Sequence, residues 1–570
     1  MRSISATTLF LRRLKPLQQG ARAASSFTQS QGYRNRPLTY LLVGLLLGGA
    51  SVSTLKLSSV SSPNGNTAPR WGESTKPSSL RSKYADKKTM LKAVDEIRRE
   101  LGEEAVSTDP DDLEYHGYSE ISTSNTDERP FAVVRPQSTE QVSAIAKICT
   151  RYKVPMVPFG AKSSMEGNYS SPFSGICIDM CEMDKIVEFH PQDMDIVVQA
   201  GVNWTVLNEE IKDTGLFLPP DPGPTALIGG MVATNCSGTN AMRYGAMKDY
   251  VVNLTVVLAD GTIIKTRHRP RKTSAGYNLN SLFTGSEGTL GIITQATLKL
   301  AVLPTNLSAA AAAFESVHQA VAAASTMIRS GLPLAALELM DDQQMRSINK
   351  SGGTAGRMWE ENPTLFLKFA GTENSMKDSV KAAQAICRTH SARTFDSVYG
   401  EKEIDSLWSA RKRALFAAIA EQPKGAMVWG TDVAVPISRM ADLIEESRAK
   451  ATGLNLWNSV LGHVGDGNFH QAMFYLPNDA IGKNKVADCV DTMVKRAIEM
   501  EGTVSGEHGI GIGKKDCLLK ELGPSTIGVM KAVKDALDPQ YVFCVLIFGF
   551  NPADMTLPSW LLNPGKVFDE

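Results

Sequence analysis

The chain contains 570 residues, more than a single hydrophobic core holds, so two or three domains are expected. Its hydrophobic content of 42% and charged content of 21% are typical of a globular protein. The net charge of +0 hides an asymmetry: nine of the 60 basic residues lie in residues 1–72, which contain no acid, so 51 basic and 60 acidic residues remain, a net charge of −9. No basic patch with interleaved aromatic residues indicates nucleic-acid binding, and the eight scattered cysteines predict no disulfide framework.

The amino-terminal region has the composition of an import signal. Residues 1–27 are rich in Arg, Ser, Ala and Leu and lack acid, as mitochondrial presequences do. The apolar stretch that follows carries no charge over about 17 residues, the lower limit for crossing a bilayer. We therefore expect a presequence and basic segment in residues 1–37, a membrane anchor in 38–55 and a linker in 56–86. A disordered basic tail and a cleaved sorting segment are the alternatives.

The first folded elements are predicted from residue 87 onward. Residues 90–101 have the apolar spacing of an amphipathic helix within an N-terminal helical segment, residues 87–128. A strand is expected at 131–136, and a helix at 138–152 with Ser138 as its N-cap. Residues 155–160 predict a strand that runs into a turn.

Three glycine-rich blocks follow, at residues 157–168 (VPFGAKSSMEGN), 219–245 and 283–293. Glycines and small hydroxyl residues let backbone N–H groups approach a pyrophosphate. The blocks do not have the GxGxxG pattern opening a helix, and GKS/T is absent, which argues against a Rossmann site and excludes a P-loop. Because strand-like segments separate the blocks, they predict one extended ligand held by loops. Any one block alone is more often a set of tight turns.

The second half of the chain alternates helices and strands. The Ala-rich residues 308–329 predict a helix, residues 365–369 a strand and residues 376–390 a helix. Arg411 lies in a further helix-like segment. The segment at Asp432 has no assigned role from sequence, and its carboxylate is a candidate for capping a turn.

Three of the chain's eight histidines gather in two short segments near residue 500. His463 and His470 flank a glycine-containing turn (HVGDGNFH), and Glu507 and His508 follow in GEHG. Two imidazoles and a carboxylate suit a divalent metal with an open position, and a neighbouring histidine suits a base. The alternative is a glycine turn between two strands with incidental histidines.

Together, these motifs resemble the vanillyl-alcohol-oxidase-type flavoproteins. The order VPFGAKSSMEGN, PPDPG…IGGMVATNCSGTNAMRYG, TGSEGTLGIIT, followed by HVGDGNFH and GEHGIG, is similar to their D-2-hydroxy-acid dehydrogenase branch, over about residues 87–570. The resemblance implies an α+β fold. It would consist of a two-subdomain FAD-binding domain (residues 129–305), an α+β cap or substrate domain (306–520) and a C-terminal segment returning to the flavin (521–570).

The resemblance also implies the roles of individual residues. Arg411 would bind the substrate carboxylate, although a surface arginine is the alternative. His463, His470 and Glu507 would bind Zn²⁺ or a similar divalent metal, and His508 would take the hydroxyl proton. Non-covalent FAD is expected, because residues 157–168 contain no histidine for attachment. The expected FAD contacts are Pro158, Gly160, Ala161, Ser163, Ser164, Gly167, Asn168, Pro222, Gly223, Gly229, Gly230, Ser237, Gly238, Tyr244, Gly245, Glu287, Gly291, Ile292, Ile293 and Asn563.

With the amino-terminal signals, the resemblance implies oxidation of D-lactate to pyruvate by hydride transfer to FAD. Electrons would pass to cytochrome c, from a catalytic body that faces the intermembrane space while anchored in the mitochondrial inner membrane. D-2-hydroxyglutarate dehydrogenase is one alternative: Gly430 stands where that group carries a lysine, but Lys412 and Arg413 keep it open. A flavin-free membrane-tethered scaffold is the alternative of another class.

The carboxy terminus departs from the family pattern. Relatives run from Leu-Asp-Pro to Asn-Pro-Gly-Lys with few residues between, whereas here residues 540–562 separate Pro539 from Asn563. The interposed segment is strongly apolar and β-prone, a composition that favours aggregation when exposed. We expect a short intron read as protein in preference to a membrane-contact loop. Sequencing the transcript across this region tests the prediction.

Overall fold

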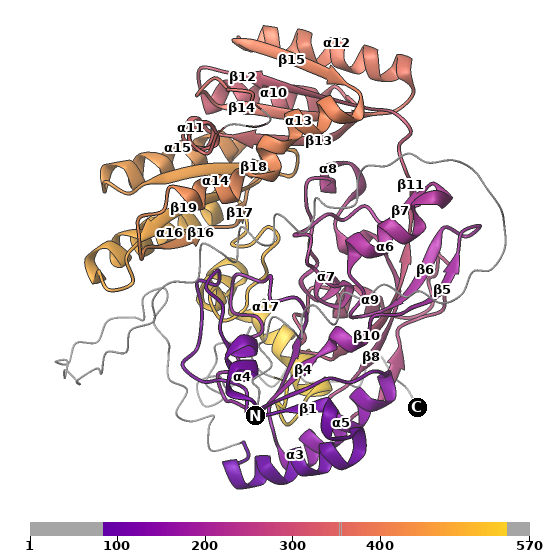
Figure 1. Ribbon diagram of the computed structural model, residues 1–570. Coiled ribbons are helices and arrows are strands. Elements are labelled where there is room, and N and C mark those ends of the chain that lie inside the picture. Colours follow the sequence, from indigo (N-terminus) through magenta and orange to yellow (C-terminus); the bar gives the residue numbers. More distant parts are fainter. Residues whose placement is uncertain (1–83, 353, 355, 544–570) are drawn as a thin grey trace. The chain divides into compact units, whose positions relative to one another are not determined.

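The computed structural model describes residues 84–352, 354 and 356–543. The predicted presequence, the anchor and all but the end of the linker lie outside the described residues, as do Asn563 and most of the predicted insertion. Among the helices of the described part, none is both long and apolar enough to span a bilayer. Figure 1 shows the described elements and labels most of them.

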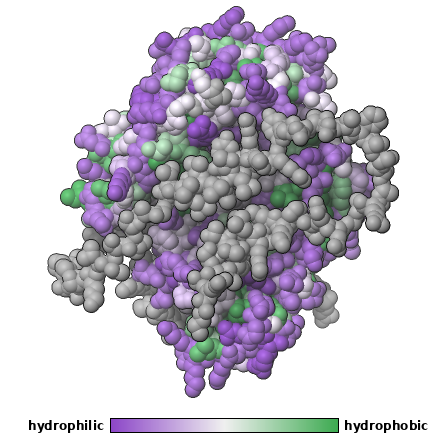
Figure 2. Space-filling view, viewed as in Figure 1, coloured by the Kyte–Doolittle hydropathy of each residue, from purple (hydrophilic) through white to green (hydrophobic). Residues whose placement is uncertain are grey.

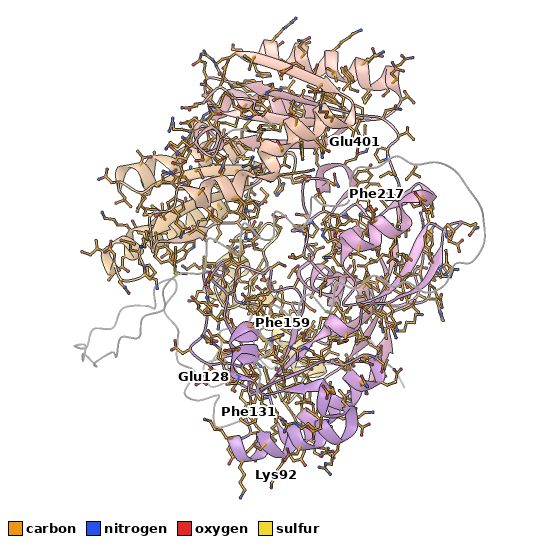
Figure 3. The ribbon with its side chains drawn as sticks, in the orientation of Figure 1. Lys92, Glu128, Phe131, Phe159, Phe217 and Glu401 are labelled. Carbon is orange, nitrogen blue, oxygen red and sulfur yellow. The ribbon has the colours of Figure 1, made fainter. Side chains whose placement is uncertain are left out.

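The first lobe, residues 84–182, is a small sheet with helices packed against it. Its elements are α3 (Lys87–Leu101), β1 (Val106–Ser107), α4 (Pro110–Gly117), β2 (Ala132–Val134), α5 (Thr139–Tyr152), β3 (Met156–Phe159) and β4 (Ile176–Asp179). The strand order is β1-β2-β4-β3, with β4 parallel to both β2 and β3. Ser138 caps α5 by accepting a hydrogen bond from the Gln141 N–H, which confirms the predicted N-cap. Phe159, labelled in Figure 3, packs with Val133 and Cys177 where β3 ends.

The second lobe, residues 183–305, is built on an antiparallel sheet. Its elements are β5 (Ile186–His190), β6 (Asp195–Gln199), α6 (Trp204–Ile211), β7 (Leu216–Phe217), α7 (Ile228–Thr234), α8 (Ala241–Tyr244), β8 (Val251–Val257), β9 (Ile263–Lys265), α9 (Leu279–Phe283), β10 (Ile292–Lys299) and β11 (Ala301–Val302). The sheet order is β5-β6-β10-β8-β9. Helix α7 packs against β6 and β10, so the glycines at its start lie beside this sheet.

The cap, residues 306–514, is larger and consists of one sheet with helices on both of its faces. Its elements are β12 (Leu307–Ala313), α10 (Val317–Arg329), β13 (Leu334–Met340), α11 (Asp342–Lys350), β14 (Thr364–Ala370), α12 (Glu373–Thr389), β15 (Thr394–Tyr399), α13 (Glu401–Lys412), α14 (Ala414–Ala420), β16 (Met427–Gly430), β17 (Val433–Ala434), α15 (Ile437–Gly453), β18 (Asn458–His463), β19 (Asn468–Tyr475) and α16 (Ala480–Glu499). The sheet order is β15-β12-β14-β13-β18-β19-β16, and β17 pairs with β19. Helices α10, α12, α15 and α16 share a core with one face of this sheet, and α11, α13 and α14 with the other.

The predicted helix over residues 308–329 is wrong in its first part. Residues 308–313 form most of β12, which pairs with both β14 and β15, and the helix begins only at Val317. Ala310 and Ala312 pack into the core of one sheet face, and Ala309 and Ala311 into the core of the other. Because both faces are covered, pairing and burial outweigh the intrinsic helix propensity of alanine.

The chain returns to the first two lobes through α17 (Lys515–Leu537), which is kinked at Gly523 and Pro524. The buried Lys534 ammonium donates to the Thr289 carbonyl at 2.7 Å and to the Asp538 carboxylate at 2.6 Å. Asp538 also accepts the backbone N–H groups of Val542 and Phe543, whose side chains are buried. The first residues of the segment predicted as an insertion are therefore part of the core, and residues 544–562 lie outside the described residues.

The cysteines of the described residues are all free. Where the described residues are visible in Figure 2, the surface is mainly hydrophilic with small, separate hydrophobic patches. This pattern fits a protein whose apolar side chains are largely buried in its hydrophobic cores.

Candidate functional site

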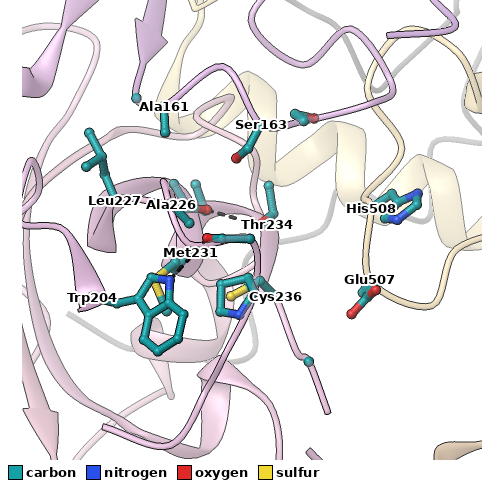
Figure 4. A pocket seen from close by; sticks show the side chains of 18 of the residues that line it. Ala161, Ser163, Trp204, Ala226, Leu227, Met231, Thr234, Cys236, Glu507 and His508 are labelled. Atoms are coloured by element: carbon teal, nitrogen blue, oxygen red, sulfur yellow. Dashed lines mark hydrogen bonds between the residues drawn. The ribbon is translucent and has the colours of Figure 1, made fainter. Parts of the chain in front are cut away.

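A cavity of about 740 Å³ lies between the two lobes and the cap, within the range of small-molecule and cofactor sites. The loop after β3, helix α7 and the third glycine block form its walls on one side, and cap residues close the other. In Figure 4, Glu507 and His508 stand across the pocket from Trp204 and Leu227. The predicted residues that line the cavity are Pro158, Gly160, Ala161, Ser163, Ser164, Asn168, Pro222, Gly223, Gly229, Gly230, Gly238, Glu287, Gly291, Ile292, Ile293, Arg411, His463, Glu507 and His508.

Four of the predicted FAD contacts that the structure describes do not line the cavity. Gly167 and Gly245 adopt φ of 72° and 85°, a backbone conformation that suits glycine, so they serve as turns. Tyr244 packs edge-on against Phe217, with ring centroids 5.5 Å apart. Ser237 instead donates its hydroxyl to Glu507 Oε2 at 2.6 Å, so it contacts a candidate metal ligand.

The glycines of the cavity wall fall into two groups. A Cβ at Gly230 or Gly223 would meet no protein atom within 4 Å, and one at Gly160 would come no closer than 4.0 Å to Leu227. None of the three has a positive φ, so their own backbone does not require glycine. They border open space, which fits an extended cofactor lying against the backbone. Gly291 differs, because a Cβ there would lie 2.5 Å from Val256 Cγ1.

The candidate metal ligands come together from the two predicted segments. His463 ends β18, His470 lies in β19, and the hairpin between them turns at Gly467 with φ of 72°. Glu507 Oε1 is 3.3 Å from His463 Nε2 and 3.2 Å from His470 Nε2. Three donor atoms within 4.8 Å of one another form a group that fits a divalent ion.

Each of these histidines is oriented by a contact through its other nitrogen. His463 Nδ1 is 3.0 Å from Glu338 Oε1, and His470 Nδ1 is 3.0 Å from the Thr431 carbonyl. Metal-binding histidines commonly make such contacts, because they direct the opposite nitrogen toward the ion. The arrangement therefore favours a ligand set over a glycine turn with incidental histidines.

Asp432 organises the loop that carries Glu507 and His508, a role that sequence reasoning missed. Its buried carboxylate accepts the N–H groups of Glu507 and His508 at 3.0 and 2.8 Å and the Ser505 hydroxyl at 2.9 Å. Asp432, His470 and His508 also form a second group of donor atoms within 4.8 Å. Because the Asp432 oxygens already accept several hydrogen bonds, the group with Glu507 is the better candidate.

Glu338 is the second residue that sequence reasoning missed. It lies in β13, on the sheet face that meets α13, and is 1% exposed. Its Oε2 accepts a hydrogen bond from Arg411 Nε at 2.9 Å. The only signal in the sequence was a glutamate within an otherwise apolar segment. That signal does not identify Arg411 or His463 as its partners.

His508 stands over the candidate metal group as an unprotonated imidazole. Its ring stacks on that of His470, with centroids 4.9 Å apart. Burial lowers the pKa of His508 to about 4, while Asp432 acts to raise it. Its Nδ1 is buried and has no hydrogen-bond partner among the described residues. A neutral ring with an unoccupied nitrogen can accept a proton.

Two carboxylates, the partly buried Glu287 and the buried Glu166, join the third glycine block and the first lobe to the GEHG loop. Glu287, predicted to contact FAD, accepts the N–H groups of Ile510 and Gly511 at 2.8 Å each, so it also positions this loop. Glu166 pairs with Lys514 Nζ at 3.1 Å, and this buried ammonium lies 3.5 Å from Asp432. The cofactor loops and the histidine loop are thus one connected network.

Two family models match this chain. Residues 130–267 match the FAD binding domain, and residues 303–544 match the C-terminal domain of FAD linked oxidases. The chain is 43% identical to the mitochondrial D-lactate dehydrogenase (cytochrome) of Kluyveromyces lactis, with 85% of this chain and 82% of that protein covered. It is 41% identical to a probable mitochondrial D-lactate dehydrogenase of Danio rerio, covering 84% of this chain and 92% of that protein.

The chain belongs to the FAD-dependent D-lactate dehydrogenase family. The mitochondrial D-2-hydroxyglutarate dehydrogenase of Bos taurus is a more distant relative. It is 29% identical to this chain, with 76% of this chain and 79% of that protein covered. Among solved structures, 4-ethylphenol oxidase from Gulosibacter chungangensis has a TM-score of 0.66 at 17% identity, covering 80% of this chain and 97% of that chain. This likeness confirms the predicted vanillyl-alcohol-oxidase-type α+β fold, and the family matches leave the flavin-free scaffold without support.

Proposed function

We propose that this enzyme oxidises D-lactate to pyruvate with FAD as hydride acceptor and cytochrome c as electron acceptor. The observation that carries the proposal is that one glycine-lined cavity is lined by Arg411, His463, Glu507 and His508. His470 completes the candidate metal group with His463 and Glu507. The names of the similar proteins agree with this substrate and acceptor. FAD is held without a covalent bond, since the loop of residues 157–168 offers no histidine for attachment.

The side chains divide the chemistry between them. Arg411 binds the carboxylate through the guanidinium N–H groups that Glu338 leaves available, which fixes the α-carbon relative to the flavin. His508 accepts the hydroxyl proton as the hydride leaves the α-carbon, and its low pKa keeps the ring unprotonated at neutral pH. His463, His470 and Glu507 would hold Zn²⁺ or a similar divalent ion, whose charge would stabilise the developing alkoxide.

The substrate class is tested by one comparison of rates. A panel of D-lactate, L-lactate, glycolate and D-2-hydroxyglutarate is assayed by flavin bleaching and by cytochrome c reduction. We expect the highest kcat/KM for D-lactate, since Gly430 offers no cation for a distal carboxylate. A preference for D-2-hydroxyglutarate would contradict the proposal. A purified protein without a flavin spectrum would instead support the flavin-free membrane-tethered scaffold.

The location is proposed from residues 1–86 alone, which lie mainly outside the described residues. The presequence directs import, and residues 38–55 arrest in the inner membrane, so the catalytic body faces the intermembrane space. There the net charge of −9 outside residues 1–72 raises its encounter rate with a basic electron carrier. Protease added after opening only the outer membrane should digest the body. A body that stays intact until the inner membrane is also opened argues for the matrix.

A further inference from the structure

Lys368 is a cation of the cavity wall whose ammonium has no hydrogen bond or ion pair within the described part of the chain. It lies in β14 and lines the cavity with Arg411 and Lys412 of α13. Its Nζ stands 4.1 Å from the ring centroid of Trp408. Trp408 and Arg411 are three residues apart in α13, so they lie on the same side of that helix.

The neighbouring cations of the cavity wall are paired with carboxylates, whereas, over the residues that the structure describes, the Lys368 ammonium is not. Arg411 is compensated by Glu338, which lies on the same sheet face as Lys368, and Lys412 lies 3.5 Å from Asp405. Asp221, also in the cavity wall, already accepts hydrogen bonds from the Thr239 hydroxyl and the Asn240 N–H. Lys368 therefore offers a carboxylate that enters beside the Arg411–Glu338 pair a positive charge that no ion pair among the described residues already neutralises.

We propose that Lys368 is a second substrate-binding residue: its ammonium binds, together with Arg411, the carboxylate of the 2-hydroxy acid. The inference rests on the proposed function of this site and deepens it. Arg411 supplies a directed fork and Lys368 a point charge, so the site requires a substrate with a charged carboxylate next to the hydroxyl-bearing carbon.

The protonation of Lys368 supplies a signature that a purely structural residue lacks. Burial lowers the pKa of Lys368 to about 8; Asp221, Asp405 and Glu338 act to raise it, and Lys412 acts to lower it. The ammonium is therefore present at neutral pH and is lost as pH rises above about 8. Binding of a carboxylate should weaken over the same interval.

The experiment compares Lys368→Met and Lys368→Arg in the full-length enzyme, with Lys377→Met on the exposed face of α12 as the control. In Lys368→Met, the KM for D-lactate should rise about 10–100-fold, because a charge-assisted contact to the carboxylate is lost. Its FAD content should be unchanged, and the alkaline fall of kcat/KM should disappear. Lys368→Arg should restore most of the affinity and move the alkaline fall to higher pH.

Binding of L-lactate to the oxidised enzyme, followed by flavin absorbance, separates this inference from the proposed function. That binding should weaken by the same factor in Lys368→Met, whereas binding of the neutral amide lactamide should not change. An unchanged affinity for L-lactate would overturn the role of Lys368 even if D-lactate is the substrate. Equal losses for lactate and lactamide, without rescue by arginine, would also overturn it. Failure of the wild type to oxidise D-lactate would overturn the proposed function alone.

Discussion

Glu338 accepts a hydrogen bond from Arg411 Nε at 2.9 Å, and its other oxygen lies 3.0 Å from His463 Nδ1. One buried carboxylate thus orients both the candidate substrate arginine and a candidate metal ligand. Burial acts to raise the pKa of Glu338, but the charges of His463 and Arg411 outweigh it and hold the pKa below its usual value. Glu338 therefore remains ionised and couples the two halves of the site.

Replacing Glu338 with Gln should impair both partners at once. We expect metal affinity to fall about 10–100-fold, as for other residues that orient metal-bound histidines. The KM for D-lactate should rise in the metal-saturated enzyme, because Arg411 loses its anchor. Metal titration and steady-state kinetics measure the two effects. The exposed Glu361→Gln serves as the control, and a normal metal affinity in Glu338→Gln would refute the coupling.

The ligand set and the base should respond differently to removal. His463→Ala, His470→Ala and Glu507→Ala should each abolish metal binding and reduce activity by a similar large factor, without additivity in double variants. His508→Ala should keep metal and FAD but slow flavin reduction by about 10²–10⁴-fold. Metal analysis and stopped-flow absorbance distinguish the two classes. Stoichiometric metal in His463→Ala would contradict the ligand set. Near-normal flavin reduction in His508→Ala would contradict the role of His508 as the base.

The two groups of wall glycines predict two kinds of failure. Val at Gly160 or Gly230 projects into the open cavity, so the protein should fold but purify without flavin. Val at Gly291 meets Val256 and Phe283 and should lower the thermal stability as well. Flavin absorbance and circular dichroism separate these outcomes. Full flavin in Gly230→Val would place the cofactor elsewhere.

The Asp112 cluster predicts a pH-dependent stability. Arg135 Nη2 donates a hydrogen bond to Asp112 at 2.7 Å, and His116 Nδ1 is 3.2 Å from the same carboxylate. Burial acts to raise the pKa of Asp112, but His116 and Arg135 lower it strongly, so its contribution is present above the unfolded pKa near 4. It is lost as pH falls further. His116, whose pKa the two carboxylates Asp112 and Asp179 raise against burial, loses its contribution as pH rises through its folded pKa.

Asp112→Asn should therefore lower the free energy of unfolding by about 1–3 kcal/mol at about pH 5–6. This interval lies between the unfolded pKa of Asp112 and the folded pKa of His116. The difference from the wild type should shrink as pH falls below about 4, because the unfolded wild-type chain then binds a proton at Asp112 that the folded state does not bind. Denaturant unfolding at several pH values measures it. Asp111→Asn, on the exposed first turn of the same helix, is the control. A difference that does not vary with pH would contradict the cluster.

Local patterns were sufficient for the features that depend on neighbours in sequence. The spacing of apolar residues predicted α3, the hydroxyl of Ser138 predicted the start of α5, and the glycine blocks with their histidine motifs indicated the cofactor and the candidate ligands. Each of these properties resides in a stretch of a few residues, where backbone freedom, capping and side-chain chemistry act directly.

Tertiary structure alone decided the rest. The alanines of β12 became a strand because β14 and β15 pair with it and helices cover both its faces. Glu338, Arg411 and His463 are widely separated in sequence, and they meet only when β13, α13 and β18 are assembled. Lys368 reads as an ordinary strand residue until Trp408 and the cavity surround it. Long-range pairing and burial determine such contacts, and no local spacing encodes them.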